Sequence, residues 1–596
     1  MTAQGGTLAD TAESASADAL ATLFGALGRR RNFKLEAGAG AGKTYSLIQA
    51  LRRILENKSA YLARSDQRVA CLTYTKVARD EIKARTDEDP AIFADTLHGF
   101  LWEMISPYQK ALAAALHASE SWKERLTETP TTSGLVIEYD LGIRSIHADR
   151  ITLHHNDVPE FAIRLFGNKK FRSLIADRFP VIFIDEYQDT PDGLADAFLS
   201  GYGSDPISPV IGFFGDHWQQ IYDRTGGSVT DSSILAIPKN ANFRSDRSIV
   251  NFLNKLRPQL PQAPRADAGE GTVTVYHTNS WPGVRLGRNW KGQISQEATQ
   301  ACLQWLQHES PSKKWIQNSG ELKVLMLTHA SIANELGYPS LPQVFRSNDA
   351  FVNKEDPVIE FLVDTAEPAL EAFSDRKYGE LFRLLGRKGP TLSAPKDKSL
   401  WSDYFNSLVS TSCTGTIGDM LDLFESQDLF SVPARVVKRG RELKEILEAL
   451  TPGEELAVPS KLAEHQALRS VPYAEVRALR SYLEDSTVFS TKHSVKGAEF
   501  DDVVVLVGRG WTKYDFAKMI AAHAPQSKPE LREAGSFSHS RNLFYVSASR
   551  AKHNLALLFV QELSNEALSV LADWAGHENV ISIEFDETGS PRPLSA

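Results

Sequence analysis

The chain has 596 residues with 66 basic and 75 acidic side chains, which gives a formal net charge of −9 at pH 7. Its 42% hydrophobic and 24% charged residues are typical of a folded protein with several domains. No run approaches the ~20 apolar residues of a membrane span and the start lacks a secretory signal, so we expect a cytoplasmic protein without a membrane partner. The three scattered cysteines predict neither a disulfide framework nor a metal cluster. The acidic balance argues against a protein that coats nucleic acid indiscriminately, but it is compatible with a basic channel.

A glycine-rich stretch, EAGAGAGKT at residues 36–44, is the first with a chemical signal. Alternate glycines let the backbone turn tightly with its N–H groups inward, as a phosphate cradle needs, while Lys43 reaches the phosphates and Thr44 can ligate Mg²⁺. Apolar residues at helical spacing follow, so we expect a helix whose positive end faces the phosphates. Ala37 replaces the first glycine of the strict pattern, and a merely flexible turn is the alternative. The predicted cradle residues are Gly38, Ala39, Gly40, Ala41, Gly42, Lys43 and Thr44.

Two further transitions from strand to helix carry polar and aromatic residues. One apolar run ends at Thr73 and Tyr74, and the next unit brings together a hydroxyl, an imidazole and a ring at Thr96, His98 and Phe100. An aromatic side chain flanked by small polar groups is typical of sites for single-stranded nucleic acid. For His98 alone, a hydrogen-bonded structural histidine is the alternative.

Four apolar residues then lead into Asp185 and Glu186. Such a run predicts a buried parallel strand whose C-terminal end delivers both carboxylates to the phosphate site. Asp185 would hold Mg²⁺ through water, and Glu186 would orient or deprotonate the attacking water. Two adjacent acids after a strand can also cap a helix, which is the alternative.

Four later blocks follow in a fixed order: GDHWQQIY at 215–222, NFRS at 242–245, TKHSVKGAEF at 491–500 and RNLFYVSASRA at 541–551. Together with the phosphate loop and the acid pair, they resemble the motifs of the UvrD/Rep-like superfamily 1A helicases. Each block is weak alone, but a chance match of all of them is negligible. The resemblance covers roughly residues 32–102, 160–330 and 480–560.

The resemblance implies roles in the nucleotide site. Gln219 couples the γ-phosphate to the nucleic-acid site, Phe243 stacks on adenine, and Glu499 contacts the ribose. Arg244 and Arg550 reach the γ-phosphate from the second motor domain, where arginines neutralise the charge of the transferring phosphoryl group. Surface ion pairs are the alternative for both arginines. The implied catalytic set is Lys43, Asp185, Glu186, Gln219, Arg244 and Arg550.

On the nucleic-acid side, the family places aromatic rings between bases. The family usually continues past the tyrosine of the third block with an aromatic residue and arginine, whereas this chain has Asp223 and Arg224. The planar guanidinium of Arg224 could replace the missing ring. The implied strand-contacting residues are Thr73, Tyr74, Thr96, His98, Phe100, Tyr222, Arg224 and His493.

Two departures concern the nucleotide. Family members commonly carry an upstream glutamine that reads adenine, but residues 5–42 contain none. Strict ATP preference is therefore less secure than nucleotide hydrolysis. Ser549 stands where threonine is usual, a change that keeps the hydroxyl.

The predicted fold is α/β, with two RecA-like motor domains of parallel sheets, each interrupted by a mainly helical insertion. The chain ends about 45 residues after Arg550, so we expect no appended nuclease domain of the RecB type. The predicted boundaries are a disordered N-terminus at 1–18, a first motor domain at 19–102 and 160–240, a helical insertion at 103–159, a second motor domain at 241–334 and 476–575, a mobile helical insertion at 335–475 and a C-terminal tail at 576–596.

The resemblance implies an ATP-dependent DNA helicase or translocase that uses ATP and Mg²⁺ and moves 3′ to 5′ on single-stranded or partly duplex DNA. Its pathway would be DNA repair, recombination or anti-phage defence. A second hypothesis is a nucleotide-gated, DNA-sensing subunit of a nuclease-containing phage-defence complex, with a nuclease partner and weak unwinding of its own. A small-molecule P-loop kinase does not explain the blocks after residue 480.

Overall fold

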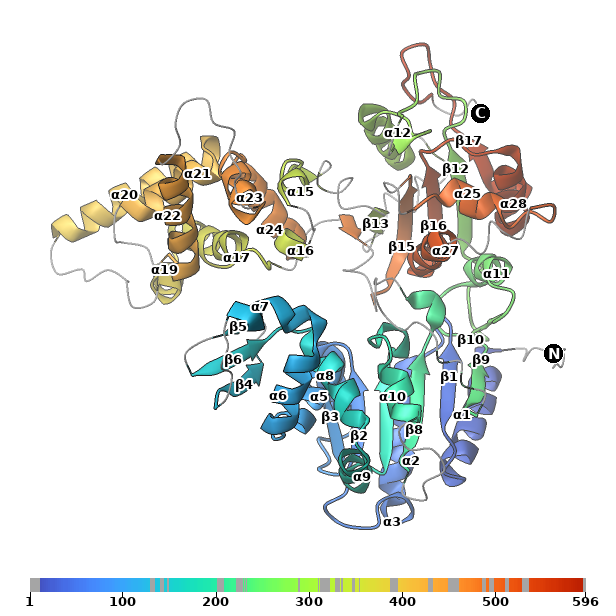
Figure 1. The fold of residues 1–596 in the computed structure, drawn as a ribbon. Coiled ribbons are helices and arrows are strands. Elements are labelled where there is room, and N and C mark those ends of the chain that lie inside the picture. Colours follow the sequence, from blue (N-terminus) through green and yellow to red (C-terminus); the bar gives the residue numbers. More distant parts are fainter. Residues whose placement is uncertain are drawn as a thin grey trace. The chain divides into compact units, whose positions relative to one another are not determined.

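The chain forms two compact units in the computed structural model (Figure 1). The first unit comprises residues 1–320, 498–503 and 511–596, and the second comprises residues 321–497 and 504–510. The structure describes residues 11–128, 134–139, 144–146, 149–200, 208–220, 229, 231, 233–287, 290–308, 310, 322–326, 333, 336–345, 349–352, 354–385, 395–426, 432–448, 460–484, 489–491, 498–509, 514–527 and 535–592.

The first unit begins with a six-stranded sheet in the order β3-β2-β7-β8-β1-β9, in which neighbouring strands run parallel. We call this sheet and its helices, up to residue 240, the first lobe. Its sheet strands are β1 Phe33–Ala37, β2 Val69–Thr73, β3 Ile92–Thr96, β7 Val181–Asp185, β8 Val210–Gly215 and β9 Leu235–Lys239. Its helices are α1 Ala12–Gly28, α2 Lys43–Glu56, α3 Lys58–Tyr61, α4 Lys76–Arg85, α5 Leu97–Ile105, α6 Gln109–Ala118, α7 Lys123–Glu128, α8 Asp157–Phe166, α9 Lys169–Arg178 and α10 Leu194–Ser200, with short η1 Glu120–Trp122, η2 Tyr187–Asp189 and η3 His217–Gln219.

Alternate residues of the central strands enter two different cores. In β7, Val181 and Phe183 pack into the core shared with α1 and α2, while Ile182 and Ile184 pack into the core shared with α5 and α8. Because helices cover both faces, the strands read as continuous apolar runs. Because the strands are parallel, their C-terminal ends meet at one edge, where the phosphate loop and the acid pair both lie.

Residues 103–159, predicted to be a helical insertion, hold more helix than strand among their described residues, and they also form a small sheet that was not predicted. They contain α6, α7 and a small sheet in the order β4-β6-β5, formed by Val136–Tyr139, Arg150–Leu153 and Ser145–Ile146. Ile137, Ile151 and Leu153 of this sheet are buried in the core with α5 and α8. Strands this short are difficult to detect from their alternation of apolar and polar residues.

The N-terminus is ordered earlier than predicted. Helix α1 begins at Ala12, and the Thr11 hydroxyl accepts a hydrogen bond from the Ser14 N–H at 3.3 Å as an N-cap. Alanines and serines, which suggested disorder, form the buried face of this helix, with Ala12, Ala15 and Ala19 buried. Small side chains let α1 pack closely against its neighbours.

The second lobe is built on four neighbouring strands in the order β15-β16-β12-β17. These strands belong to the first unit, except for residues 504–507 of β15, which belong to the second. The predicted C-terminal tail includes β17, which pairs in parallel with β12 through Tyr276 and Ile581. The elements of this lobe are β10 Ala241–Asn242, α11 Arg247–Leu256, β11 Ala263–Pro264, β12 Thr272–His277, α12 Gln296–His308, β15 Phe500–Val507, α25 Phe516–Ala521, α27 Gly535–Ala548, β16 Ala551–Phe559, α28 Asn565–Ala575, η7 His577–Asn579 and β17 Val580–Ser582.

The second unit is mainly helical in its described residues, and it also holds the parallel pair β13 and β14. The predicted insertion at 335–475 falls within this unit. Its elements are β13 Leu322–Met326, α15 Leu341–Val344, α16 Asp349–Val352, α17 Pro357–Phe361, η5 Leu362–Ala366, α18 Glu367–Ser374, α19 Tyr378–Leu385, α20 Pro395–Thr414, α21 Ile417–Ser426, α22 Ala434–Glu448, α23 Ser460–Arg469, α24 Ala474–Leu483 and β14 Phe489–Thr491.

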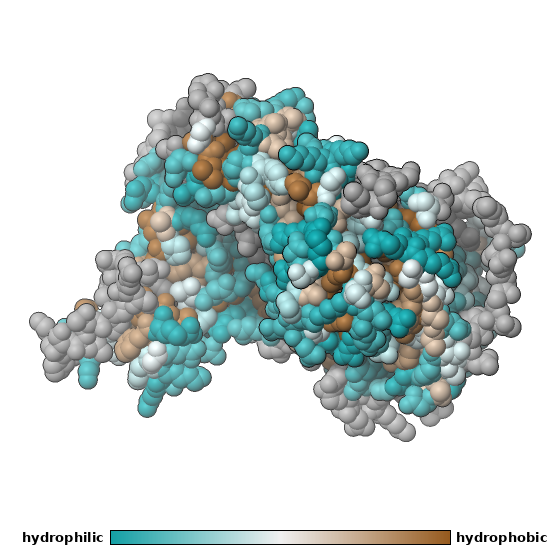
Figure 2. All heavy atoms as spheres, turned by 90° about the horizontal axis from the view of Figure 1, so that it is seen from below, coloured by the Kyte–Doolittle hydropathy of each residue, from teal (hydrophilic) through white to brown (hydrophobic). Residues whose placement is uncertain are grey.

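Hydrophilic side chains predominate on the face shown in Figure 2, with hydrophobic residues in small groups. Among the described residues, no helix combines the length and the apolar character that crossing a membrane requires.

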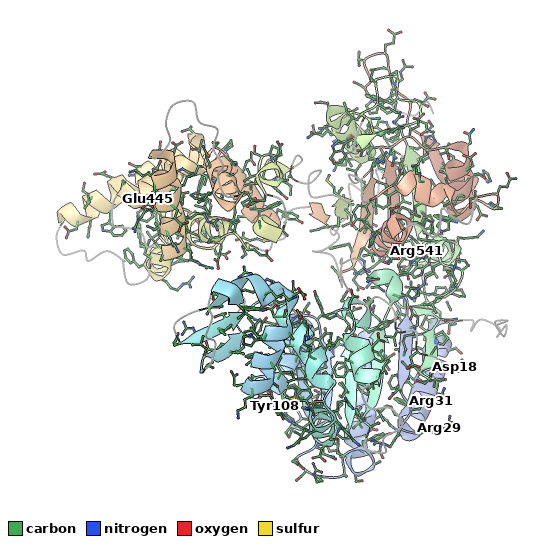
Figure 3. The ribbon with its side chains drawn as sticks, viewed as in Figure 1. Asp18, Arg29, Arg31, Tyr108, Glu445 and Arg541 are labelled. Atoms are coloured by element: carbon green, nitrogen blue, oxygen red, sulfur yellow. The ribbon has the colours of Figure 1, made fainter. Side chains whose placement is uncertain are left out.

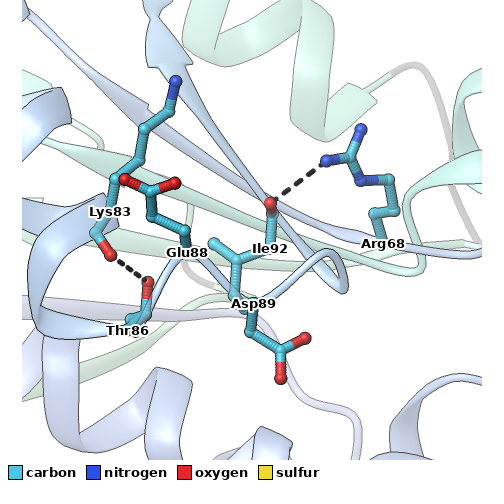
Figure 4. Close-up of a pocket in the computed structure, with 6 residues that line it drawn as sticks. All are labelled: Arg68, Lys83, Thr86, Glu88, Asp89 and Ile92. Atoms are coloured by element: carbon cyan, nitrogen blue, oxygen red, sulfur yellow. Dashed lines mark hydrogen bonds between the residues drawn. The ribbon is translucent and has the colours of Figure 1, made fainter.

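A small polar pocket of about 200 Å³ lies away from the phosphate loop (Figure 4). It is formed around the start of β3 at Ile92, where the Arg68 guanidinium donates to the Ile92 carbonyl at 3.3 Å. Lys83, Glu88 and Asp89 also line it, so charges of both signs face the same space. Because it lies at the N-terminal edge of a parallel sheet, opposite the phosphate loop, it does not belong to the nucleotide site.

Close packing around Gly212 on β8 predicts that a side chain at this position would destabilise the first lobe. A Cβ added there would lie 2.5 Å from the Phe33 ring and 2.8 Å from the Phe183 ring. Gly212→Ala should therefore lower the free energy of unfolding by ~1–3 kcal/mol, as overpacking of a core does. Gly28→Ala in α1, where an added Cβ meets nothing within 4 Å, is the control and should be neutral or slightly stabilising. Equal urea midpoints for the two variants would contradict this close packing.

Candidate functional site

The phosphate loop connects the end of β1 to the start of α2, whose N-cap is Gly42. Gly40 and Gly42 have φ angles of 73° and 74°, a region that favours glycine. A Cβ on Gly40 would also lie 2.8 Å from the Arg244 Cβ and 2.8 Å from the Asn242 Oδ1. Glycine is required at position 40 both by its backbone conformation and by the close approach of the second lobe.

The acid pair faces the loop across the edge of the sheet. The Glu186 carboxylate lies 3.3 Å from the Lys43 Nζ and accepts a hydrogen bond from the Gln188 amide at 2.6 Å. Glu186 has a φ of 49°, a strained conformation for a side chain other than glycine. Asp185 is buried at the end of β7, and Thr44 lies in the first turn of α2.

This arrangement fits a nucleoside triphosphate with Mg²⁺. Backbone N–H groups at the start of α2 and the ammonium of Lys43 are donors for phosphate oxygens. The Thr44 hydroxyl and the Asp185 carboxylate are the hard oxygen ligands that Mg²⁺ prefers. The structure thus brings together the predicted cradle and acid pair, whose roles remain predictions.

The second lobe hydrogen bonds directly to the backbone of the loop. The carbonyl of Ala39 accepts from the side-chain amides of Asn242 at 3.3 Å and Gln262 at 3.1 Å, and the Ala39 N–H donates to the Tyr545 hydroxyl at 3.0 Å. The Phe243 N–H donates to the Gly40 carbonyl at 2.8 Å. Sequence reasoning missed Gln262, which lies outside every recognised block.

Arg244 lies over the loop, as its predicted role requires. Its guanidinium donates to the Glu499 carboxylate at 2.9 Å and to the Ser549 carbonyl at 2.8 Å. Glu499, predicted to contact a ribose, is thus an ion-pair partner of Arg244 in this structure. The alternative of a surface ion pair does not describe Arg244, because only 11% of its side chain is exposed.

Arg550 is buried in the turn between α27, which ends at Ala548, and β16, which begins at Ala551. Its guanidinium donates to the carbonyls of Val546 and Ala498 at 2.9 and 3.1 Å. Burial and then the charge of Arg244 lower the pKa of Arg550 to about 9, partly offset by nearby groups that include Glu186. The hydrogen bonds of the Arg550 guanidinium to Val546, Ala498 and Ser549 thus hold it within its own lobe.

Gln219 lies on the loop at 216–220, which follows β8. Its buried amide donates to the Asp216 carboxylate at 2.9 Å. The Asn542 amide donates to the Gln220 carbonyl at 3.1 Å, and the guanidinium of Arg541, labelled in Figure 3, lies 4.0 Å from the centroid of the Trp218 ring. The second lobe therefore holds this loop as well as the phosphate loop.

Lys239 is a second lysine that sequence reasoning missed. Its fully buried Nζ donates to the Gly42 carbonyl at 3.1 Å and to the Ser46 hydroxyl at 2.7 Å. Burial lowers the pKa of Lys239 to about 8. Its ammonium lies 5.8 Å from the centroid of the Phe243 ring, which belongs to the predicted base-stacking position. Lys239 adds positive charge directly beside the first turn of α2.

The predicted strand-contacting residues are brought together only in part. Thr73 and Thr96 are register partners at the ends of β2 and β3. The buried Thr73 hydroxyl donates to the Thr75 carbonyl at 3.0 Å, and the Thr96 hydroxyl accepts from the Gly99 N–H at 3.1 Å as the N-cap of α5. Tyr74 is 41% exposed and can offer its ring to a base.

Phe100 is not available for stacking, and the prediction for this residue is wrong. Its ring is fully buried and makes edge contacts with Phe93 and Phe179 at centroid distances of 5.9 and 5.4 Å. An aromatic residue in the first turns of a helix that covers a sheet packs into the core. The sequence pattern did not distinguish that position from an exposed one.

His98 is half-buried and stacks on His155, with ring centroids 3.5 Å apart. The Nδ1 of His155 is 2.7 Å from the Tyr139 hydroxyl on β4. These contacts support the structural alternative for His98. The predicted residues Tyr222, Arg224 and His493 lie outside the residues that the structure describes.

Comparisons with known proteins agree with the nucleotide site. Residues 24–225 match the AAA domain family. The chain is 20% identical to Gabija protein GajB of Bacillus cereus (strain HuB5-5) over an alignment of 686 residues that covers 91% of this chain and 95% of that protein. It is 27% identical over 240 residues to Gabija protein GajB of Bacillus cereus (strain VD045), covering 37% of this chain and 46% of that protein. The match marks the first lobe as an ATPase-type, nucleotide-binding domain.

The buried stack of His98 on His155 predicts that the folded protein becomes less stable at acidic pH. Burial and then the charge of His155 lower the pKa of His98 to about 3, from 6.5. Between these two values the unfolded chain binds more protons than the folded chain, so the free energy of unfolding falls as the pH falls from 6.5 towards 3. His98→Gln should lose less stability than the wild type between pH 7.5 and 4.5, as measured by urea unfolding.

His117→Gln, at an exposed histidine of α6, is the matched control and should retain the wild-type dependence on pH. An identical loss of stability for His98→Gln and the wild type would show that His98 is not held neutral by its surroundings.

Proposed function

We propose that this protein is an ATP-driven motor of the UvrD/Rep-like type, which hydrolyses ATP between its two lobes and moves on single-stranded DNA. The observation that carries the proposal is the approach of Arg244 to the phosphate loop, from a different lobe than Lys43 and Glu186. A site completed by two lobes can convert hydrolysis into relative movement of those lobes. The resemblance of the sequence blocks supplies the direction, 3′ to 5′.

In the proposed reaction, Lys43 binds the β- and γ-phosphates, and Thr44 and Asp185 would hold Mg²⁺, which would neutralise phosphate charge. The Lys43 ammonium is 3.3 Å from Glu186 in this structure, so an incoming triphosphate competes with that carboxylate for the ammonium. Glu186 is then able to accept the proton of the attacking water. Its strained backbone holds the carboxylate at this position.

The two arginines stabilise the charge that spreads over the transferring phosphoryl group. Arg244 is already over the loop. Burial and the charge of Arg244 lower the pKa of Arg550, so an anion bound close to both guanidinium groups would reduce the energetic cost of burying Arg550. Arginines in such positions contribute on the order of 10³–10⁵ in rate.

A second candidate function is a nucleotide-gated, DNA-sensing subunit of a nuclease-containing phage-defence complex. The departure at Arg224, which removes a usual stacking ring, favours weak unwinding by the chain alone. The similarity to Gabija protein GajB over 95% of that protein favours a shared role, so an assay with a candidate partner tests this alternative.

Substitutions in the acid pair and the loop should abolish hydrolysis without unfolding the protein. Glu186→Gln should lower kcat by on the order of 10²–10⁴-fold, the usual contribution of a positioned general base, while ATP binding is retained. Lys43→Ala should weaken ATP binding itself, because it removes a phosphate ligand. Asp192→Asn, an exposed carboxylate nearby, is the control. Wild-type turnover in the first two variants would exclude this site from hydrolysis.

Single-stranded DNA should stimulate ATP hydrolysis, and Tyr74→Ala should weaken strand binding by ~5- to 150-fold, the value of one lost base stack. Tyr378→Ala, in the second unit, removes a tyrosine of similar exposure and should change nothing. The measurements are turnover with increasing oligonucleotide concentration and translocation on a labelled strand. If the oligonucleotide fails to stimulate the wild type alone but does so with a nuclease partner, the second candidate function is favoured.

A further inference from the structure

Arg257 is a buried arginine of the second lobe whose ionic partners belong to the first lobe. It follows helix α11 directly, and only 2% of its surface is exposed. Its Nη1 forms an ion pair with the Asp216 carboxylate at 2.8 Å, and its Nη2 donates to the Glu36 carboxylate at 3.2 Å. No predicted block contains this residue, and no catalytic role was assigned to it.

Each carboxylate lies at or beside a loop of the nucleotide site. Glu36 lies on β1, immediately before the phosphate loop, and also accepts from the Tyr187 hydroxyl at 2.6 Å. Asp216 begins the loop at 216–220, where it binds the Gln219 amide and accepts from the Trp218 N–H at 3.0 Å. One guanidinium therefore connects the strand that positions the phosphate loop with the loop that carries Gln219.

The two carboxylates of this cluster already have a cationic partner. Ligand atoms of Glu36, Asp216 and His217 lie within 4.8 Å of one another, a spacing compatible with a metal ion. Arg257 forms ion pairs with both carboxylates, and the His217 imidazole donates to Glu36, so the guanidinium supplies the positive charge that a metal ion would otherwise provide. Although burial raises the pKa of Glu36, hydrogen bonding from His217 and Tyr187 lowers it to about 2, so this carboxylate stays ionised.

Aromatic rings enclose the guanidinium and limit its freedom. Its central carbon lies 5.1 Å from the centroid of the Trp218 ring and 5.4 Å from that of the Tyr545 ring. Tyr545 also accepts the hydrogen bond from the Ala39 N–H of the phosphate loop. Because a buried charge that loses one partner is strongly destabilised, a shift of Glu36 is passed to Asp216 through Arg257.

We propose that Arg257 is a positioning residue that couples nucleotide at the phosphate loop to the loop at 216–220, which carries Gln219, by binding Glu36 and Asp216 at the same time. The inference rests on the proposed function, and it names the contact through which that function is coupled to DNA. Arg257 does not touch the substrate in this role. Its effect is exerted through Gln219 and the loop that carries it.

The primary test is Arg257→Lys in the full chain. Lysine keeps the buried positive charge but is a point charge that does not span two carboxylates as a planar guanidinium does. We expect the ratio of DNA-stimulated to unstimulated kcat to fall at least ~5-fold, the lower end of typical coupling between two sites. The KM for ATP should change less than this ratio, because Lys43 and Thr44 are untouched.

The matched control is Lys255→Gln, which removes a cation two residues away on α11. Lys255 is exposed and forms its ion pair with Asp573 at 2.9 Å, so the stimulation ratio should remain that of the wild type. An unchanged ratio in Arg257→Lys, with the wild type stimulated, would overturn the inference and leave the motor intact. A wild type that DNA does not stimulate, alone or with a partner, would instead overturn the proposed function and with it the inference.

Glu36→Gln provides a second, independent test in case Arg257→Lys is too unstable to measure. The amide keeps a hydrogen bond with Tyr187 but removes the charge that Arg257 binds, so the stimulation ratio should fall. The double variant Glu36→Gln/Arg257→Lys should lose no more than the worse single variant, because both act on one contact. Thermal unfolding identifies which variants are folded at the assay temperature, and additive losses in folded variants would overturn the inference.

Discussion

The first turn of the phosphate loop obtains its hydrogen bonds from the other lobe. Within the loop the Ala41 N–H donates to the Gly38 carbonyl at 3.1 Å, but the N–H and C=O of Ala39 need partners from elsewhere, as buried backbone groups do. Tyr545, Gln262 and Asn242 supply those partners at Ala39, so the shape of the loop depends on the position of the second lobe. The same approach brings Arg244 against Gly40 and leaves no space for a side chain there. A ligand that changes the shape of the phosphate loop would therefore also change the contacts between the loop and the second lobe.

Several positively charged side chains are buried around the nucleotide site. Burial is the largest cause of the lowered pKa values of Lys239, at about 8, Arg541, at about 10, and Arg550, at about 9. Each of these shifts means that the protein surroundings stabilise the cation less than water does. A polyphosphate supplies the missing negative charge, so its binding energy includes relief of this cost. Arg257 differs from these groups because its two carboxylates are provided by the protein and raise its pKa.

The sequence predicted the parts of the site whose chemistry demands fixed residue types at fixed spacing. Gly40, Lys43 and the acid pair were identified because a phosphate cradle and its carboxylates allow few substitutes. Arg257 and Gln262 were not, because a buried donor between two loops can come from any segment that the fold brings near. Phe100 was misassigned because core packing and base stacking both use an aromatic ring after a polar residue. The strands β4, β5 and β6 were missed because two to four residues carry too little periodicity.

The two sides of the site differ in how firmly the structure holds their side chains. Residues that face the nucleotide are buried and bonded on several sides, as Lys239 and Arg244 are. Among the predicted strand-contacting residues, Thr73 and Thr96 use their hydroxyls within the protein, and Tyr74 is 41% exposed. The motor function proposed above would require such a difference. Phosphate transfer needs donors that do not move during the reaction, whereas a strand that is to be passed along must be held by contacts that can be released, and stacking on an exposed ring is independent of base sequence.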